Sequence, residues 1–250
     1  MKLSKKIIQV ITLILFYNMA AETIALVGES GTGKSTALRN LNPEETFIIS
    51  TTGKPLPFRA WKKKYTPLKK DEDGNWSGNY YVSSKWDAII KILTIVNKKM
   101  PHIKQVVIDD FQYVLSYEFV DRATEVGYTK FSELAQHAME ILRYSEQMRD
   151  DCKMIFLTHS ENVGDAMNPK YVIKTVGKLL AEKVTLEGLF TYIFFTKVTE
   201  GDDGKMQYKL LTNSDGTCIA KTSFGMFEDM EIDNDLAEII KVIDAYNEGE

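Results

Sequence analysis

The sequence has little with which to build a disulfide-stabilised, zinc-binding or strongly basic protein. Its 250 residues include two cysteines and three histidines, and Cys152 and Cys218 stand far apart without the spacing of a metal site. Such cysteines are typical of reduced, buried thiols in a reducing cytosol. The formal net charge of −4 excludes a global positive field for nucleic acid, so any such binding has to come from a local basic patch.

A long hydrophobic run is also missing. The most apolar stretch, residues 7–17, is too short to span a bilayer comfortably. It follows Lys2, Lys5 and Lys6 and precedes small residues, which is the order of a secretory signal peptide. Two other interpretations stay open: Met19 is the natural start, or the segment is an amphipathic arm that packs on a neighbouring subunit. We expect residues 1–19 to be an extension without stable membrane association, in front of one cytoplasmic domain over residues 20–250.

The rest of the chain has the composition of an ordinary globular protein, with 44% hydrophobic and 26% charged residues. It contains no internal repeat and no low-complexity tract. Short, wholly apolar runs alternate with segments of helical period, which predicts an α/β fold with a mainly parallel sheet and helices on both faces. Residues 201–204 predict the turn of a C-terminal β-hairpin. The expected strands are 23–27, 46–50, 105–109, 153–158 and 190–198. One helix is expected to begin at residue 36, and four more are expected over 86–98, 131–149, 179–189 and 236–246.

The most informative stretch is residues 28–35, which match the Walker A pattern G-x-x-x-x-G-K-[ST] at every fixed position. An apolar strand leads into this stretch and a helix is expected to leave it, which is the setting of a phosphate-binding loop. The glycines let backbone amides turn toward an anion, Lys34 would reach the β- and γ-phosphates, and Ser35 would ligate Mg²⁺. The predicted contacts to the cofactor, ATP with Mg²⁺, are Gly28, Glu29, Ser30, Gly31, Thr32, Gly33, Lys34, Ser35 and Thr36.

Two further strand ends carry polar residues. Residues 106–109 predict a strand beside the loop strand that delivers Asp109 to the metal. Asp110 would then polarise the attacking water, although it could equally cap the following helix. Thr158 and His159 end another strand, where they could sense the γ-phosphate or only satisfy their own backbone.

The loop-rich segment 51–81 contains a basic run, and an acidic tail follows much later at 228–250. The basic run interleaves cations with aromatic rings, as single-stranded nucleic-acid sites do. It could equally be a solvated face, because the acidic residues 71–73 follow at once. The candidate contacts to single-stranded DNA are Arg59, Trp61, Lys62, Lys63, Lys64 and Tyr65.

Several of these motifs together resemble a group of phage-encoded, RecA-like or AAA-family ATPases. The resemblance rests on residues 24–35, 53–58, 106–113, 156–161 and 212–222. It implies a RecA-like P-loop core acting in phage DNA recombination or replication, with strand annealing beside a single-strand-binding protein in some relatives. It also implies a homo-oligomer with ATP between subunits, for which Lys221 is the candidate trans cation. RecA recombinases carry a glutamate after the second strand, where this chain has residues 50–52 as Ser-Thr-Thr, so either Asp110 replaces it or hydrolysis is slow.

Two other functions stay open at this point. A small-molecule kinase usually has an arginine-rich lid, yet residues 161–183 contain lysines and no arginine. An ATP-dependent switch or helicase loader would bind nucleotide with little turnover. No guanine-reading Asn-Lys-x-Asp motif is present, which favours ATP over GTP.

Overall fold

A computed structural model describes residues 20–176 and 184–249. The central feature is an eight-stranded sheet in the order β12-β11-β10-β1-β7-β6-β2-β5. Every neighbouring pair from β10 to β5 is parallel, and β11 and β12 add antiparallel strands at one edge. The predicted α/β class with a mainly parallel sheet is confirmed. The predicted extension over residues 1–19 lies outside the described residues.

The strands and helices have the following bounds. The sheet comprises β1 (Thr23–Val27), β2 (Thr46–Ser50), β5 (Tyr80–Val82), β6 (Gln105–Asp109), β7 (Lys153–Thr158), β10 (Tyr192–Glu200), β11 (Met206–Leu211) and β12 (Glu231–Asp233). Two small hairpins pair β3 (Lys69–Lys70) with β4 (Trp76–Ser77) and β8 (Ser160–Asn162) with β9 (Tyr171–Ile173). The helices are η1 (Ser35–Asn40), α2 (Trp61–Lys64), α3 (Trp86–Lys99), α4 (Gln112–Asp121), α5 (Thr129–Leu142), η2 (Arg143–Glu146), η3 (Leu186–Leu189) and α7 (Leu236–Glu248).

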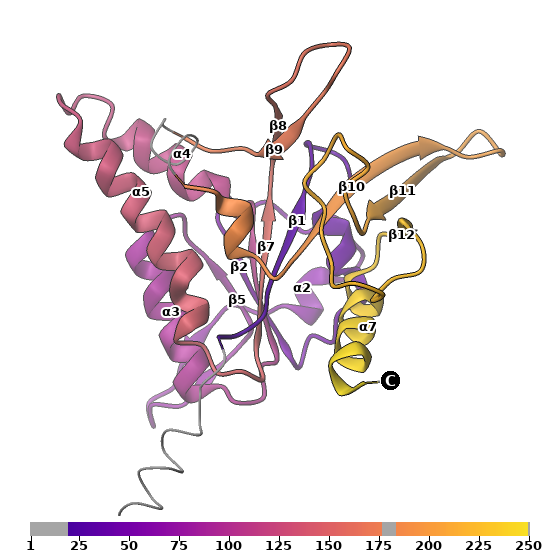
Figure 1. Ribbon diagram of the computed structural model, residues 1–250. Coiled ribbons are helices and arrows are strands. Elements are labelled where there is room, and N and C mark those ends of the chain that lie inside the picture. The colour runs from indigo at the N-terminus through magenta and orange to yellow at the C-terminus, as the bar shows by residue number, and fades with distance from the viewer. Residues whose placement is uncertain (1–19, 177–183, 250) are drawn as a thin grey trace, which may run out of the picture.

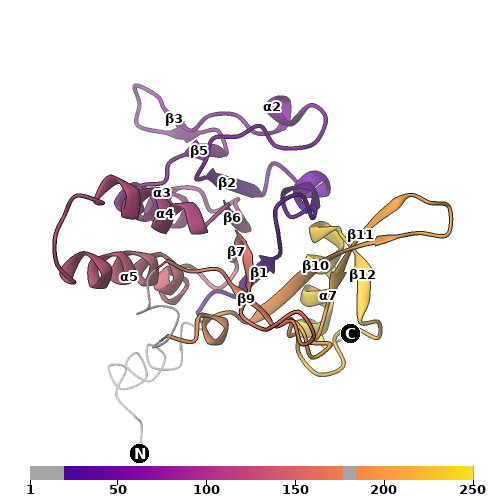
Figure 2. The same cartoon turned by 90° about the horizontal axis from the view of Figure 1, so that it is seen from above.

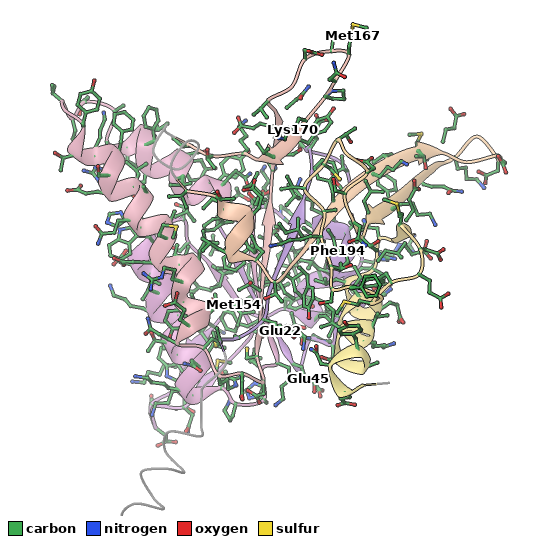
Figure 3. The ribbon with its side chains drawn as sticks, in the orientation of Figure 1. Glu22, Glu45, Met154, Met167, Lys170 and Phe194 are labelled. Atoms are coloured by element: carbon green, nitrogen blue, oxygen red, sulfur yellow. The ribbon has the colours of Figure 1, made fainter. Side chains whose placement is uncertain are left out.

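Helices cover both faces of the sheet, as predicted (Figures 1 and 2). Alternate strand residues point to opposite faces, so the wholly buried strands supply two cores. Helices α3, α4 and α5 pack on one face, with residues such as Ala25 and Phe156, while η1 and α7 pack on the other, with Leu26 and Phe194. Figure 3 shows Met154 and Phe194 within this interior, whereas Met167 extends at the tip of the loop between β8 and β9.

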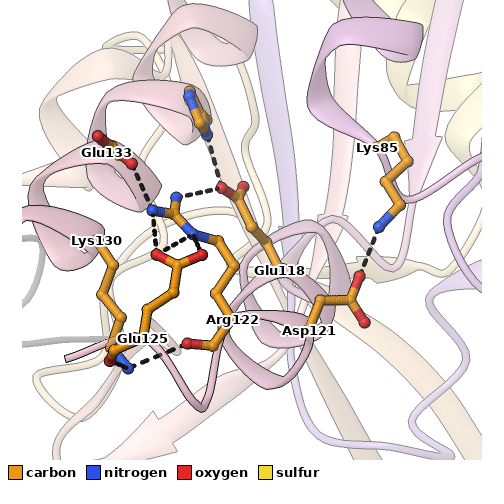
Figure 4. A network of polar contacts seen from close by, with 8 residues as sticks. Lys85, Glu118, Asp121, Arg122, Glu125, Lys130 and Glu133 are labelled. Carbon is orange, nitrogen blue, oxygen red and sulfur yellow. Dashed lines mark hydrogen bonds and ion pairs between the residues drawn. The ribbon is translucent and has the colours of Figure 1, made fainter.

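A cluster of charged side chains connects α4 to α5 on the first face (Figure 4). The Arg122 guanidinium contacts Glu118 one turn earlier on α4, Glu125 in the connecting loop and Glu133 on α5. Lys130 donates to backbone carbonyl oxygens of the same loop, including that of Glu125 at 2.8 Å. The corner therefore pairs each buried or half-buried cation with several acceptors, which fixes how the two helices meet.

The sequence-based prediction differs from the structure in the order of the strands. We expected β6 to lie beside β1, but β7 lies between them and pairs with both. The end of β7 therefore lies between the carboxyl end of β6 and the phosphate loop that follows β1.

Several segment boundaries also differ. The loop-rich segment 51–81 contains the small β3–β4 hairpin and ends in β5, which joins the edge of the main sheet beside β2. The helix expected over 131–149 already begins at Thr129, and its α-helical part ends at Leu142. The helix expected over 179–189 lies partly outside the described residues, and its described end is the short turn η3. None of the helices in residues 20–176 and 184–249 is long and apolar enough to cross a membrane.

Candidate nucleotide site

The loop of residues 28–34 leaves the carboxyl end of β1 and leads directly into η1. Because neighbouring strands are parallel, the ends of β2, β6, β7 and β1 lie at the same edge of the sheet. Ligands of open α/β sheets bind at this edge. The helix after the loop is a six-residue 3-10 helix, so its dipole contributes less than the full helix expected from the sequence.

Two glycines of the loop are required by close contacts. A Cβ at Gly28 would lie 1.7 Å from the Thr196 hydroxyl oxygen on β10. Gly33 has a φ of +93°, and a Cβ there would lie 2.5 Å from the side-chain nitrogen of Asn234. Neither position accepts a side chain without moving its neighbour, so the loop lies tightly between β10 and the start of α7.

Lys34 is buried within this loop, with 6% of its surface exposed. Its ammonium group donates to the carbonyl oxygens of Gly28 at 2.8 Å and Glu29 at 2.7 Å. Burial lowers the pKa of Lys34 to about 8, although the charges of Asp110, Asp109 and Glu29 oppose that change. An anion beside Lys34 would favour its charged form further, so this ammonium group is suited to a phosphate.

Ser35 and Asp109 join the loop to the end of β6. The Ser35 hydroxyl donates to Asp109 Oδ1 at 2.8 Å, and Asp109 is 6% exposed. Burial, with the charge of Asp110 as the second cause, raises the pKa of Asp109 to about 6, while Ser35, Lys34 and Lys54 act against the rise. A nearby cation would favour the charged carboxylate and lower the pKa of Asp109 again.

The donor set fits Mg²⁺. A hydroxyl and a carboxylate supply the oxygen ligands that Mg²⁺ prefers, and its remaining positions are usually filled by water and substrate phosphates. No group of three or more His, Cys, Asp or Glu side chains suited to a metal occurs in the described part of the chain. A site with only one or two protein ligands is therefore the arrangement that these residues can form.

Asp110 follows Asp109 in an unusual backbone conformation, with a φ of 62°. The Thr51 hydroxyl holds this turn by donating to the carbonyl oxygens of Asp109 at 3.1 Å and Asp110 at 2.8 Å. The Asp110 carboxylate lies 3.5 Å from His159 Nε2 and 4.0 Å from Lys54 Nζ. Burial opposes its charge, but His159, Lys54 and Lys34 outweigh burial and lower the pKa of Asp110.

The alternative role for Asp110, capping the next helix, does not match this geometry. The N-cap of α4 is Phe111, and no side-chain cap bond occurs there among the described residues. The carboxylate instead faces the cavity described next.

A cavity of about 360 Å³ brings most of the predicted residues together. It is lined by Ser30, Gly31, Gly33, Lys34, Ser35, Thr36, Lys54, Pro55, Pro57, Asp109, Asp110, His159 and Tyr208. Lys54 and Tyr208 were not among the predicted contacts. Lys54 could have been predicted, because it is a polar residue soon after β2, a strand that ends at the ligand edge. No local pattern in β11 indicated Tyr208.

The end of β7 is less simple than expected. His159 lines the cavity, but Thr158 is 1% exposed and lies behind it. The hydroxyl oxygens of Thr158 and Ser160 are buried without a hydrogen-bond partner within residues 20–176 and 184–249. Of the two interpretations left open for this strand end, the one in which the side chains only satisfy their own backbone does not hold for the Thr158 hydroxyl.

The basic run only partly keeps its predicted form. Lys62, Lys63 and Lys64 are exposed on α2, and Arg59 is exposed just before it. Tyr65 is 2% exposed and packs in the core with Leu38, so the prediction that its ring stacks on bases is wrong. Burying the Tyr65 ring against apolar side chains is more favourable than leaving it exposed to stack on a base. Trp61 is half-buried against Tyr80, with ring centroids 5.4 Å apart.

Lys221 lies away from the residues that line the cavity. Its backbone forms an isolated antiparallel bridge with Ile193 at the start of β10, with hydrogen bonds of 2.9 Å in both directions. The backbone of Lys221, the candidate trans cation, is therefore fixed to the main sheet.

No family model and no curated protein matches the chain. Among solved structures, the X-ray structure of the Legionella pneumophila ATPase DotB is similar at a TM-score of 0.37 and 12% sequence identity. The match covers 86% of this chain and 50% of the DotB chain, so the chain spans about half the length of that structure.

Proposed function

We propose that the chain binds ATP with Mg²⁺ and hydrolyses its γ-phosphate. The observation that carries the proposal is the placement of the Ser35–Asp109 pair, Lys34 and Asp110 around one cavity at the carboxyl edge of the sheet. A cation-binding pair, a buried ammonium group and a second carboxylate are the parts that phosphoryl transfer from a nucleotide requires.

Binding would use the loop in two ways. The backbone amides of residues 30–35 would surround the phosphates, and Lys34 would exchange its carbonyl partners for the β- and γ-phosphate oxygens. Ser35 and Asp109 would hold Mg²⁺, which neutralises charge on the phosphates when it is bound. The Ser35–Asp109 hydrogen bond of 2.8 Å keeps the two oxygen ligands together in the lining of the cavity.

Asp110 would act on the water. Its carboxylate would accept a hydrogen bond from a water molecule and orient the oxygen toward the γ-phosphorus. The bond from that phosphorus to the bridging oxygen breaks as the new bond forms, the proton of the water passes to the Asp110 carboxylate, and ADP and inorganic phosphate leave. His159 at 3.5 Å would keep Asp110 charged and in position. Asp110 would thereby take the role that a glutamate after the second strand has in RecA recombinases, a position at which this chain has Ser-Thr-Thr over residues 50–52.

The test separates binding from hydrolysis. Asp110→Asn preserves shape and also tolerates a positive φ, so we expect MgATP affinity to be kept. Phosphate release should fall about 100-fold or more, as expected for loss of a general base. Asp121→Asn, on the exposed surface of α4, is the matched control. Unchanged phosphate release by Asp110→Asn would remove Asp110 from the mechanism.

We assign the ATPase a role in DNA metabolism, on single-stranded DNA. The support is the resemblance of its motifs to phage recombination ATPases, together with the exposed side chains of Lys62, Lys63 and Lys64. Partners of this type would be a single-strand-binding protein and further copies of the chain, with Lys221 reaching a neighbour's nucleotide.

Phosphate release measured with and without single-stranded DNA tests this role. Stimulation by DNA that is lost when the three lysines of α2 become alanine would support it. Transfer of phosphate to a metabolite would instead indicate a kinase. Tight nucleotide binding with negligible turnover, with or without DNA, would indicate a switch or helicase loader.

A further inference from the structure

The geometry points to a nucleoside subsite, formed by Tyr208 and Asn234, beside the phosphate loop. This inference rests on the proposed function, because it places the base and ribose of the same nucleotide. The subsite is a pocket of about 460 Å³ between η1, β11 and the start of α7. Its volume falls within the range of roughly 300–1,000 Å³ for small-ligand pockets. It is lined by Thr36, Arg39, Tyr208, Asp233, Asn234, Asp235 and Glu238.

The pocket adjoins the phosphate cavity. Thr36 and Tyr208 line both. A Cβ at Gly33 would lie 3.2 Å from the Tyr208 ring, so that ring lies directly against the phosphate loop. A ligand with phosphates at Lys34 can therefore continue past Tyr208 into the second pocket without leaving the protein surface.

Within residues 20–176 and 184–249, Asn234 contributes an acceptor without a partner to the lining of the pocket. Its side-chain nitrogen donates to the Gly33 carbonyl oxygen at 2.9 Å, which fixes the amide. Its Oδ1 is buried and has no hydrogen-bond partner among the described residues. Asn234 as a whole is 4% exposed. An acceptor left buried in this way is costly unless a donor reaches it. A ribose hydroxyl or an amino group of a base would be such a donor.

The charges of the pocket argue against a further phosphate. The described lining has three carboxylates and one cation: Arg39 contacts Asp235 and the Asn234 carbonyl oxygen, while Asp233 and Glu238 pair with Lys209 and Lys241, which do not line the pocket. Carboxylates accept hydrogen bonds and repel anions. A neutral group rich in donors, such as a nucleoside, suits this lining, whereas a polyphosphate or a second nucleotide does not.

Tyr208 supplies the surface on which a base would stack. Its side chain is 46% exposed although it lies on a strand of the main sheet. Stacking of a base on an aromatic ring is worth about 1–3 kcal/mol, which corresponds to about 5- to 150-fold in affinity. Because the ring is half outside the core, its removal should leave the fold intact.

The test compares MgATP with magnesium tripolyphosphate, which has the phosphates but no nucleoside. We expect Tyr208→Ala to weaken MgATP binding at least fivefold while leaving tripolyphosphate affinity unchanged. Tyr208→Phe should bind both ligands as the unaltered protein does, and so should Tyr128→Ala, whose tyrosine is 89% exposed in the α4–α5 connection.

Two results would overturn the subsite. Tyr208→Ala could bind MgATP as tightly as the unaltered protein, or it could weaken both ligands equally, which would mean that it only disturbs the loop. Failure of the unaltered protein to bind either ligand is a different result, because it would refute the proposed function and the subsite together.

Discussion

Replacing Asp109 with asparagine should stabilise the protein in the absence of metal while removing its ability to hold Mg²⁺. Burial raises the pKa of Asp109 from 3.8 to about 6. At neutral pH the folded state therefore contains a charged carboxylate in a buried site that disfavours the charge. Asparagine is nearly the same shape, and its side-chain oxygen can still accept the Ser35 hydrogen bond. The substitution therefore removes the cost of the charge and keeps the local packing.

The magnitude follows from the difference in pKa. A rise of about two units, at 1.36 kcal/mol per unit, corresponds to about 3 kcal/mol. The sign follows from proton linkage. Because the folded pKa lies above the unfolded one, the folded protein binds the extra proton between them, so stability is fully present below pH 3.8 and falls as pH rises to about 6. Above pH 6 the cost is constant, and Asp109→Asn should recover most of it.

Urea denaturation of the metal-free protein at pH 5 and pH 8 would measure this effect. The free energy of unfolding of Asp109→Asn should exceed that of the unaltered protein by about 3 kcal/mol at pH 8 and by less at pH 5. Asp121→Asn, which breaks an exposed pair with Lys85, should change the free energy of unfolding by about 1 kcal/mol or less. An Asp109→Asn variant that is less stable than the unaltered protein at pH 8 would show that the charge of Asp109 does not destabilise the metal-free fold.

Two further predictions concern the same cavity. Gly33→Ala forces a side chain onto a φ of +93° and within 2.5 Å of Asn234. It should lower the free energy of unfolding by about 1–3 kcal/mol and weaken nucleotide binding. Wild-type stability and affinity would contradict the described loop. Lys54→Gln removes a charge that lowers the pKa of Asp110, so the acidic limb of the pH profile of phosphate release should move to higher pH. Lys62→Gln, on α2, should leave that limb unchanged, and an unmoved limb in Lys54→Gln would show that Lys54 does not act on Asp110.

The phosphate loop was predictable because its contacts are local. Lys34 donates to carbonyl oxygens five and six residues before it, so one short pattern specifies the whole arrangement. Apolar runs identified the strands for a similar reason, since each is buried on both faces. Asp109 could be placed at the ligand edge because it ends such a run.

The remaining features depend on how distant segments meet. A run such as residues 105–109 predicts a strand but not its neighbours, and so β7 between β1 and β6 was missed. Asn234 meets Gly33 across 201 positions of sequence, and no local pattern marks it. Tyr65 follows a helix of only four residues, which is too short for its spacing to show which side chains face the core.

Calorimetric titration of the purified protein with MgATP, beside Lys34→Ala, measures whether the phosphate loop holds a nucleotide. We expect one nucleotide bound per chain, with binding lost in Lys34→Ala while the fold, followed by circular dichroism, is unchanged. Nucleotide binding that is equally tight without the Lys34 ammonium group, or no binding by the unaltered protein, would contradict that expectation.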